Sequence, residues 1–352
     1  MKSMITFRPP LNLKPMVPLI AGALLIILLV YYVDPSRLFV QAGKIPLLAF
    51  VQFGASVLVF HILRSIRWRS LLRRMEADPS FGTVFWTNMI GYGVNAFIPV
   101  RFGGEVARAY VIESKARVGF FPSLSSIAVE RILDLLAIVG LATFGAMSYS
   151  SSANRGNFIL ILTSTGTVTL AMLAVVLIGS RNLPGVMRFF RWILSKIPMR
   201  NSWRGRLLTV VESTLVGVAS IGRDRRLVGV SVILSVAIWL ANFAGFYALF
   251  LAVGFGGPVQ ALLLAIMLFQ LSFILPSTPG NVGTFEGFLI LFVGGLGLGA
   301  VDATLAVGVV GHLINLFIVG ALSVAGAVLL GLRLKELFRI PSMKKTLIKN
   351  EA

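Results

Sequence analysis

Two interrupted apolar stretches carry the residue types of an anion-binding site. The first reads Asn95-Ala-Phe-Ile-Pro-Val-Arg-Phe-Gly-Gly-Glu105, and the second reads Leu275-Pro-Ser-Thr-Pro-Gly-Asn-Val-Gly-Thr-Phe-Glu286. Each contains a proline, a glycine four residues later, and then a glutamate at the start of a predicted helix. The glycine-to-glutamate spacing differs by one residue, so we interpret the two stretches as an approximate internal repeat.

These residue types suit a helix that stops inside a membrane and turns back. Proline ends the incoming helix, and glycine permits the reversal. The amides and dipole of the new helix then attract an anion such as phosphate. Paired interruptions in two halves of a membrane protein point to a transport site. We therefore predict a substrate-binding site formed by Arg101, Gly103, Gly104, Glu105, Asn281, Gly283, Thr284 and Glu286. The alternative is a pair of surface loops whose glutamates stabilise helix N-termini.

Polar residues inside the apolar runs form a second candidate group. Charges at membrane depth are costly and usually face a partner or a cavity. Glu130 and Asp134 share a helix face, and Arg131 can pair with Asp134. This group is either a gate, which could also pair with Arg101, or a structural ion-pair cluster. The full predicted charge network is Glu130, Arg131, Asp134, His312 and Asn315.

Metal and thiol chemistry are not expected. The chain has no cysteine, and its only histidines are His61 and His312, so a zinc site is not predicted. For His312, which shares a helix face with Asn315, an interhelical hydrogen bond is favoured over a proton relay. We predict no catalytic residues, no metal and no cofactor.

The elements that hold these residues are membrane-spanning helices. The chain has 352 residues, of which 57% are hydrophobic and 13% are charged. A helix needs about 20 mainly apolar residues to cross the hydrocarbon core. Six runs qualify, and the stretches 81–117 and 258–299 are interrupted. We predict an all-α integral membrane protein with six full spans and two broken or re-entrant hairpins. The six runs are 17–33, 45–63, 122–148, 157–179, 227–253 and 302–332.

The basic residues indicate the orientation. The segments 64–78, 181–206 and 333–349 are rich in arginine or lysine, which places them and both termini in the cytoplasm. The two interrupted stretches then enter from opposite sides. The net charge of +19 is explained by this pattern, so nucleic-acid binding is not expected. Residues 183–197 form a predicted basic amphipathic helix on the cytoplasmic leaflet. Trp68, Trp192 and Trp203 border basic segments and are predicted interfacial anchors.

We predict one transmembrane domain over residues 1–352. Its core covers 15–335, its cytoplasmic interfacial region covers 183–221, and its basic cytoplasmic tail covers 336–352.

The sequence resembles the transmembrane-region family of lysylphosphatidylglycerol synthases, the flippase-like domain family, over roughly residues 15–335. The motifs that carry the resemblance are Asn95 to Glu105 with the following Val-Ala-Arg-Ala-Tyr, Val129-Glu-Arg-x-x-Asp134, and Pro276 to Glu286. The resemblance implies movement of aminoacylated phosphatidylglycerol or related lipids between leaflets. Bifunctional members carry a soluble aminoacyl-transferase domain that this sequence lacks, so we do not expect lysyl-lipid synthesis.

The expected function is a flippase, not an enzyme, in a bacterial or archaeal cytoplasmic membrane. It would move an anionic phospholipid or a lipid-linked precursor, with membrane lipids as its partners. No Gly-x-x-x-x-Gly-Lys loop is present, so ATP is not the expected energy source. The alternatives are a lipid-sugar glycosyltransferase and an accessory subunit of a glycosyltransferase or lipid synthase. We also consider a homo-oligomer.

Overall fold

All the described regular structure in this chain is helical. The computed structural model describes residues 35–74, 78–97, 103–148, 182–197, 224–275 and 278–332, with isolated positions at 167, 204, 205, 208, 211, 212, 215 and 216. Within these residues, three helices are long and apolar enough to cross a membrane by length and composition. The prediction of an all-α membrane protein is confirmed. The predicted spans 17–33 and 157–179 and the tail 336–352 lie outside the described residues, apart from position 167.

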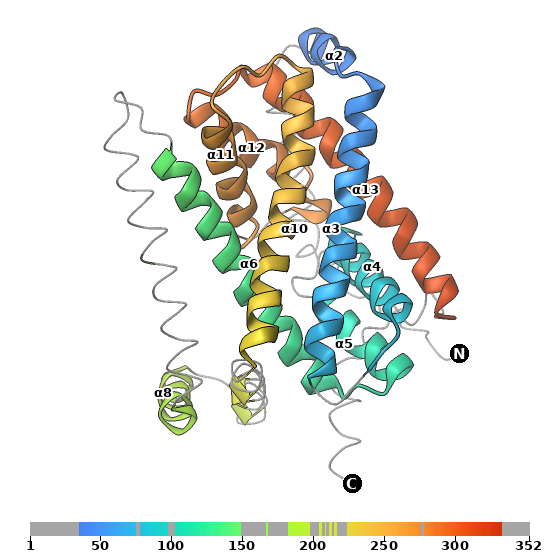
Figure 1. The fold of residues 1–352 in the computed structure, drawn as a ribbon, viewed down its shortest axis with the longest axis vertical. Coiled ribbons are helices and arrows are strands. Elements are labelled where there is room, and N and C mark those ends of the chain that lie inside the picture. Colours follow the sequence, from blue (N-terminus) through green and yellow to red (C-terminus); the bar gives the residue numbers. More distant parts are fainter. Residues whose placement is uncertain are drawn as a thin grey trace, which may run out of the picture.

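The first half of the described chain begins with a short helix, α2 (Pro35–Gly43), followed by the long α3 (Leu47–Arg73). A broken hairpin follows, made of α4 (Phe81–Phe97) and α5 (Gly103–Ala116). The long α6 (Phe120–Ser148) completes the set. In Figure 1, α4 and α5 occupy the end of the molecule opposite to α2.

The second half repeats this order. The long α10 (Arg225–Ala252) leads to a broken hairpin of α11 (Val259–Ser272), the 3₁₀ turn η2 (Pro279–Asn281) and α12 (Thr284–Gly295). The long α13 (Val301–Leu329) follows. Figure 1 shows α11 and α12 in the half of the molecule that α2 caps, opposite to α4 and α5. The prediction that the two hairpins enter from opposite ends agrees with this arrangement.

Three of the four hairpin helices are short. At 1.5 Å per residue, α11 and α12 reach about 21 and 18 Å, and α4 and α5 reach about 26 and 21 Å. The hydrocarbon core is about 30 Å thick. These lengths favour the re-entrant form of the two predicted hairpins.

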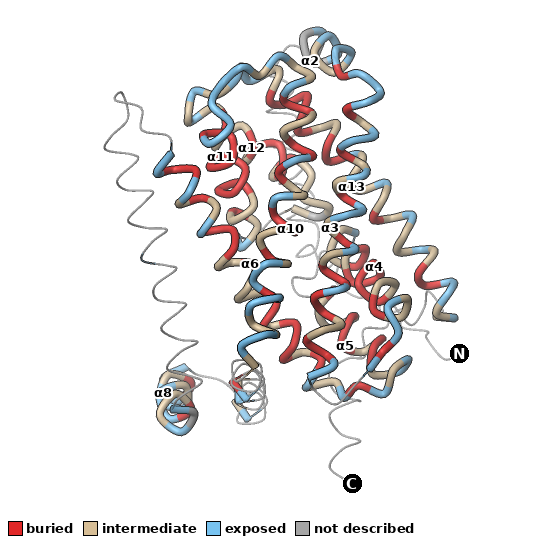
Figure 2. The backbone as a smooth tube through the Cα atoms, viewed as in Figure 1, coloured by how far each residue is buried: buried red, intermediate tan, exposed pale blue. Residues whose placement is uncertain are grey.

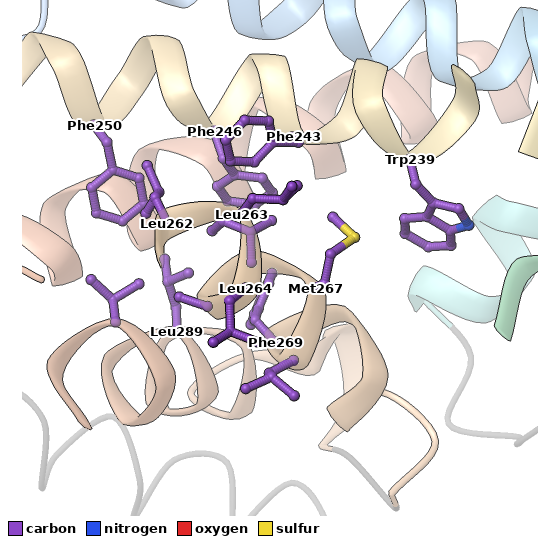
Figure 3. Close-up of a cluster of buried hydrophobic side chains, with 14 of the residues drawn as sticks. Trp239, Phe243, Phe246, Phe250, Leu262, Leu263, Leu264, Met267, Phe269 and Leu289 are labelled. Atoms are coloured by element: carbon purple, nitrogen blue, oxygen red, sulfur yellow. The ribbon is translucent and has the colours of Figure 1, made fainter. Parts of the chain in front are cut away.

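The long helices α3 and α10 form the centre of the bundle. Phe53 of α3 meets Phe246 of α10 edge to face, with ring centroids 5.4 Å apart. Phe246 also contacts Phe269 of α11 and Phe285 of α12, so the second hairpin packs on the same aromatic core. Figure 3 shows this cluster between α10, α11 and α12. The long helices carry exposed apolar side chains, as lipid contact requires. Figure 2 shows where the exposed residues lie along these helices.

The predicted amphipathic helix is present as α8 (Leu183–Lys196). Asn182 caps it by accepting a hydrogen bond from the Gly185 amide at 2.9 Å. Figure 1 shows α8 nearly end-on, across the direction of the long helices. Phe189 and Trp192 are exposed and stack on each other. This agrees with the predicted interfacial position of Trp192, whereas Trp203 lies outside the described residues.

One predicted boundary is wrong. The run 45–63 was expected to end before a basic cytoplasmic loop, but α3 continues to Arg73. Arg64 and Arg67 are buried inside the bundle, because carboxylates on α6 neutralise them. Arg64 and Arg67 are therefore core residues and do not indicate which side of the membrane is cytoplasmic. Only the basic residues after them in 64–78 support the predicted orientation.

Candidate functional site

The first break is held together by Asn95 at the end of α4. Its side-chain oxygen accepts a hydrogen bond from the Gly104 amide at 2.7 Å, and its nitrogen donates to Glu105 at 3.2 Å. One side chain therefore ties the arriving helix to the first turn of the returning helix. The Gly104 amide, which we predicted as a phosphate donor, is already engaged. An anion at this amide would have to displace the Asn95 carboxamide.

Glycines allow α4 and α5 to cross closely at this break. A Cβ atom at Gly104 would collide with the Gly91 carbonyl oxygen, and one at Gly91 would collide with Arg108. Both glycines are buried in helices. The sequence pattern indicated that the glycines permit a reversal, but Gly104 is required for close helix packing.

A buried cluster of charges lies next to this crossing. Asp134 accepts a hydrogen bond from Arg64 at 2.5 Å and lies 2.8 Å from Arg67. Glu130 accepts from Arg108 at 2.5 Å and lies 3.6 Å from Arg67. All five side chains are 5% exposed or less, so neither carboxylate is left to interact with water. Glu130 and Asp134 are like charges on one face of α6, and three arginines offset their mutual repulsion.

Aromatic residues enclose this cluster. The Tyr92 hydroxyl accepts a hydrogen bond from Arg64. The Arg108 guanidinium lies 4.1 Å from the centre of the Trp68 ring, and the Trp68 nitrogen donates to Ser126 at 2.9 Å. Trp68 is fully buried, so the prediction that it anchors the protein at the membrane surface is wrong. The ring of Trp68 contacts a cation and its N–H has an acceptor inside the protein, so burial leaves neither group without a partner.

Glu105 and Arg131 form the more accessible edge of the charge cluster. Arg131 donates to Glu105 at 2.8 Å and lies 3.9 Å from Asp134, as its spacing predicted. The Arg131 side chain is 40% exposed, in contrast to the inner arginines. Four arginines and three carboxylates meet in the whole cluster, which leaves an excess of positive charge. Arg131 is therefore the cation of this group that a ligand can reach.

The second break is built from residues in left-handed backbone conformations. Gly280, Asn281 and Gly283 all have φ between 56° and 78°. Glycine adopts this region without a steric penalty, and asparagine is among the few residues that tolerate it. Thr284 donates to the Asn281 carbonyl at 3.0 Å, and Thr278 lies 3.1 Å from Thr284. The reversal predicted for this stretch is present, with Thr284 as the first residue of α12.

Glu286 and His312 form a buried pair at this break. His312 Nδ1 lies 2.8 Å from Glu286 Oε1, and His312 Nε2 lies 2.8 Å from the Gly280 carbonyl oxygen. Glu286 Oε2 accepts from the Gly283 amide at 2.8 Å. The His312 ring stacks on Phe285 with centroids 4.4 Å apart. The prediction that His312 is an interhelical hydrogen-bond partner is confirmed. No hydrogen bond joins Asn315 to a described residue.

The two breaks carry equivalent pairs. Glu105 is the third residue of α5, and Glu286 is the third residue of α12. Each glutamate pairs with a basic residue on the next long helix, Arg131 or His312, and each pair is separated by 26 residues. The two breaks therefore match more closely in their contacts than in their sequences, because the spacing from glycine to glutamate differs by one residue between them.

The two hairpins meet. The turn η2 packs against α4, and a Cβ atom at Gly280 would lie 3.5 Å from the Ala96 carbonyl oxygen. The turn of the second hairpin therefore touches the end of α4 in the first hairpin, which enters from the opposite end of the molecule. Arg101 lies outside the described residues, so its predicted contacts with the phosphate or the charge network remain predictions. Among the described residues, no group of histidines and carboxylates has the arrangement of a metal site.

Some site residues were missed by sequence reasoning. Arg64, Arg67 and Arg108 belong to the charge cluster, and Asn95 joins α4 to α5. Arg64 and Arg67 directly follow an apolar run, three residues apart, which is compatible with one helix face turned to a buried partner. That spacing was the available signal, but the basic residues of 64–78 led to the prediction of a cytoplasmic segment.

Comparisons with known proteins agree with the membrane architecture. The family described as lysylphosphatidylglycerol synthase TM region matches residues 16–323. The glycosyltransferase AglD of Haloferax volcanii is 25% identical over an alignment of 355 positions, which covers 92% of this chain and 55% of that protein. This chain therefore spans about half the length of that relative.

Two further relatives are archaeal UPF0104 membrane proteins. One from Methanothermobacter thermautotrophicus is 25% identical over 294 residues, covering 80% of this chain and 86% of the relative. One from Methanocaldococcus jannaschii is 24% identical over 283 residues, covering 79% of this chain and 84% of the relative. No solved structure matches this chain.

Proposed function

Because this chain belongs to the lysylphosphatidylglycerol synthase TM-region family, we propose that it is a flippase that moves an anionic phospholipid or a lipid-linked precursor between the leaflets of its membrane. The observation that carries this proposal is the contact between two broken hairpins that enter from opposite ends. Such a contact is where a transporter can expose one site alternately to each side.

The charges at the contact suit a phosphate-containing head group. The α5 side of the site has an excess of positive charge, and its accessible member is Arg131. Arginine binds phosphate oxygens through a planar fork of donors. Glu105 already occupies part of this fork, so a phosphate would compete with Glu105 for Arg131. In this proposal, exchange of partners at Arg131 links head-group binding to the first turn of α5.

The tail of the lipid needs no binding site inside the protein. The outer faces of α3, α10 and α13 carry exposed apolar side chains along much of their length, so the acyl or isoprenoid chain can remain in the bilayer. Only the head group must then enter the charged region between the hairpins. A charged region for the head group beside apolar surfaces for the tail fits a transported lipid better than a water-soluble substrate.

The name of one relative favours a second candidate. The glycosyltransferase AglD is longer than this chain, and the match covers 55% of it. The chain could therefore serve a glycosyltransferase or lipid synthase as its membrane subunit, or transfer sugar from a lipid carrier itself. Sugar transfer by the purified protein from a polyprenyl-phosphate donor would support this candidate over the flippase.

The proposed location is a bacterial or archaeal cytoplasmic membrane, with both termini in the cytoplasm. The basic helix α8 would then lie on the anionic inner leaflet. The proposed partners are anionic lipids, and a homo-oligomer is compatible with the exposed apolar faces of the long helices.

Translocation of fluorescent lipids in proteoliposomes tests the proposal. We expect the wild-type protein to move an anionic lipid at least ten times faster than empty vesicles, and Arg101→Ala, Arg131→Gln and Glu286→Gln to lose most of this rate. Asp78→Asn is the matched control, because Asp78 is an exposed carboxylate paired with Arg73 outside the site. Equal translocation rates in the wild type and all three site variants would contradict the assignment of the site. A wild-type rate no higher than that of empty vesicles would contradict the proposed flippase activity.

A further inference from the structure

The geometry around His312 fixes where its protons must be. The Gly280 carbonyl oxygen, 2.8 Å from Nε2, can only accept a hydrogen bond. Nε2 must therefore carry a hydrogen. A neutral His312 then has only a lone pair at Nδ1, the atom that faces Glu286 Oε1 at 2.8 Å. Two lone pairs at that distance repel each other, so a hydrogen must lie between Nδ1 and Oε1.

This hydrogen belongs to the pair. It is held either as a neutral carboxylic acid facing a neutral imidazole or as a carboxylate facing an imidazolium. Both forms have zero net charge, which suits side chains that are 9% exposed or less. Loss of the hydrogen leaves one buried carboxylate without a cation. The two residues therefore hold one proton between them.

In the part of the chain that the structure describes, no other ionisable side chain contacts this pair. The helices α11 and α12 and the turn η2 contain no ionisable residue except Glu286. Among the other elements packed against α12 and α13, no ionisable residue with a described side chain forms a hydrogen bond or ion pair with Glu286 or His312. The ionisable residues on those elements are Arg37, His61, Arg64, Arg67, Arg69, Arg73, Tyr92, Arg225, Arg226 and Tyr247. Helix α13 itself also carries Asp302, in its first turn.

The equivalent pair in the first half behaves differently. Arg131 holds Glu105 with a guanidinium that stays charged at every physiological pH. Histidine is the side chain whose charge changes in that range. The two halves therefore carry one permanent ion pair and one proton-dependent pair at equivalent positions.

We propose that Glu286 and His312 form a proton-binding site that couples proton movement to the opening of the second hairpin. His312 holds both sides of this break, η2 through Gly280 and α12 through Glu286. Release of the proton breaks the contact with Glu286, so His312 stays bonded to Gly280 of η2 but no longer ties η2 to α12. The turn η2 packs on α4 of the first hairpin, so this release changes how the two hairpins are joined. A proton gradient then drives the rearrangement between the hairpins. This inference rests on the proposed flippase for its role in transport, but the proton site stands without it.

Nuclear magnetic resonance tests the site without any transport assay. The variant His61→Gln leaves His312 as the only histidine, so ¹⁵N-histidine labelling gives a single ring signal set. We expect Nε2 to stay protonated and the Nδ1 signal to show the shared hydrogen. In Glu286→Gln the Nδ1 signal should differ from the wild type, because the carboxylate partner is lost. A proton on Nδ1 with none on Nε2, or the same Nδ1 signal with and without Glu286, would overturn the proposal.

Proteoliposomes with a pH indicator inside test the coupling. We expect an imposed pH gradient to change wild-type lipid translocation at least threefold and to drive proton movement with it. In His312→Arg, which copies the permanent pair of the first half, and in His312→Gln, both effects should be lost, whereas Asp78→Asn should retain them. Variants are compared only if they elute as the wild type does in size-exclusion chromatography.

The outcomes separate the two proposals. Wild-type lipid translocation with no response to the gradient and no proton movement would overturn the coupling and leave the flippase in place. A shared proton seen by resonance together with no lipid translocation would support the proton site and contradict the flippase.

Discussion

Gly104 controls how closely the two helices of the first hairpin approach. Its amide donates to Asn95, and its Cα position faces the Gly91 carbonyl oxygen on α4. Backbone atoms on a packed helix cannot move aside as a flexible side chain can. The glycine pair therefore sets the geometry that places Glu105 and Arg108 beside the charge cluster.

Substitution of Gly104 by alanine should destabilise the protein. The added methyl group overlaps backbone atoms of α4, and such overpacking costs about 1–3 kcal/mol. Thermal unfolding in detergent measures this loss. Gly140→Ala on α6 is the matched control, because nothing lies within 4 Å of a Cβ atom there. If Gly104→Ala unfolds at the same temperature as Gly140→Ala, the close crossing of α4 and α5 is not a determinant of stability.

At the scale of elements, the charge cluster joins α3, α5 and α6. Arg64 and Arg67 extend from α3, Arg108 from α5, and Glu130 and Asp134 from α6. Charges inside a bundle are tolerated only when each has a partner. The cluster therefore specifies how these three helices sit together, and it forms the rigid side of the proposed site.

Removal of one carboxylate from this cluster should be costly. Asp134→Asn leaves Arg64 and Arg67 without their shared anion, and breaking a buried pair in this way costs about 3–5 kcal/mol. Unfolding by denaturing detergent gives the change in stability. Asp78→Asn removes an exposed partner of Arg73 and should have no measurable effect. Equal stability of the two variants would contradict a structural role for the cluster.

The sequence predicted the elements better than their contacts. The runs 122–148, 227–253 and 302–332 correspond to α6, α10 and α13 within three residues at each end, because hydropathy reports length and apolar content directly. The end of α3 was missed because the partner of Arg64 is 70 residues away. Hydropathy scores an arginine alone and cannot register a distant carboxylate that neutralises it. The pairing of Glu286 with His312 was missed for the same reason.

At the scale of the whole molecule, the described chain is two similar halves in opposite orientations. Each half runs from a long helix through a broken hairpin to a second long helix, and each places a glutamate–cation pair at the break (Figure 1). In the proposed flippase, opposed halves of this kind would give each membrane face an equivalent route to the point where the hairpins touch. This symmetry is the structural reason for proposing alternating access.

The proposed orientation can be checked with single cysteines, because the chain contains none. Position 78 lies at the α5 end of the bundle, and Gly256 lies in the connection between α10 and α11 at the opposite end. With the termini inside, a membrane-impermeant maleimide should label Gly256→Cys in intact spheroplasts and label Asp78→Cys only after permeabilisation. Labelling of position 78 from outside would reverse the proposed topology.

The central claim is that lipid passes where the two hairpins meet, and a reversible cross-link tests it most directly. Ala96 and Gly280 lie on opposite sides of this contact. We predict that a short, reducible thiol cross-linker stops lipid translocation by Ala96→Cys/Gly280→Cys in proteoliposomes, that reduction restores it, and that each single variant is unaffected by the reagent. Undiminished translocation by the fully cross-linked protein would contradict the account.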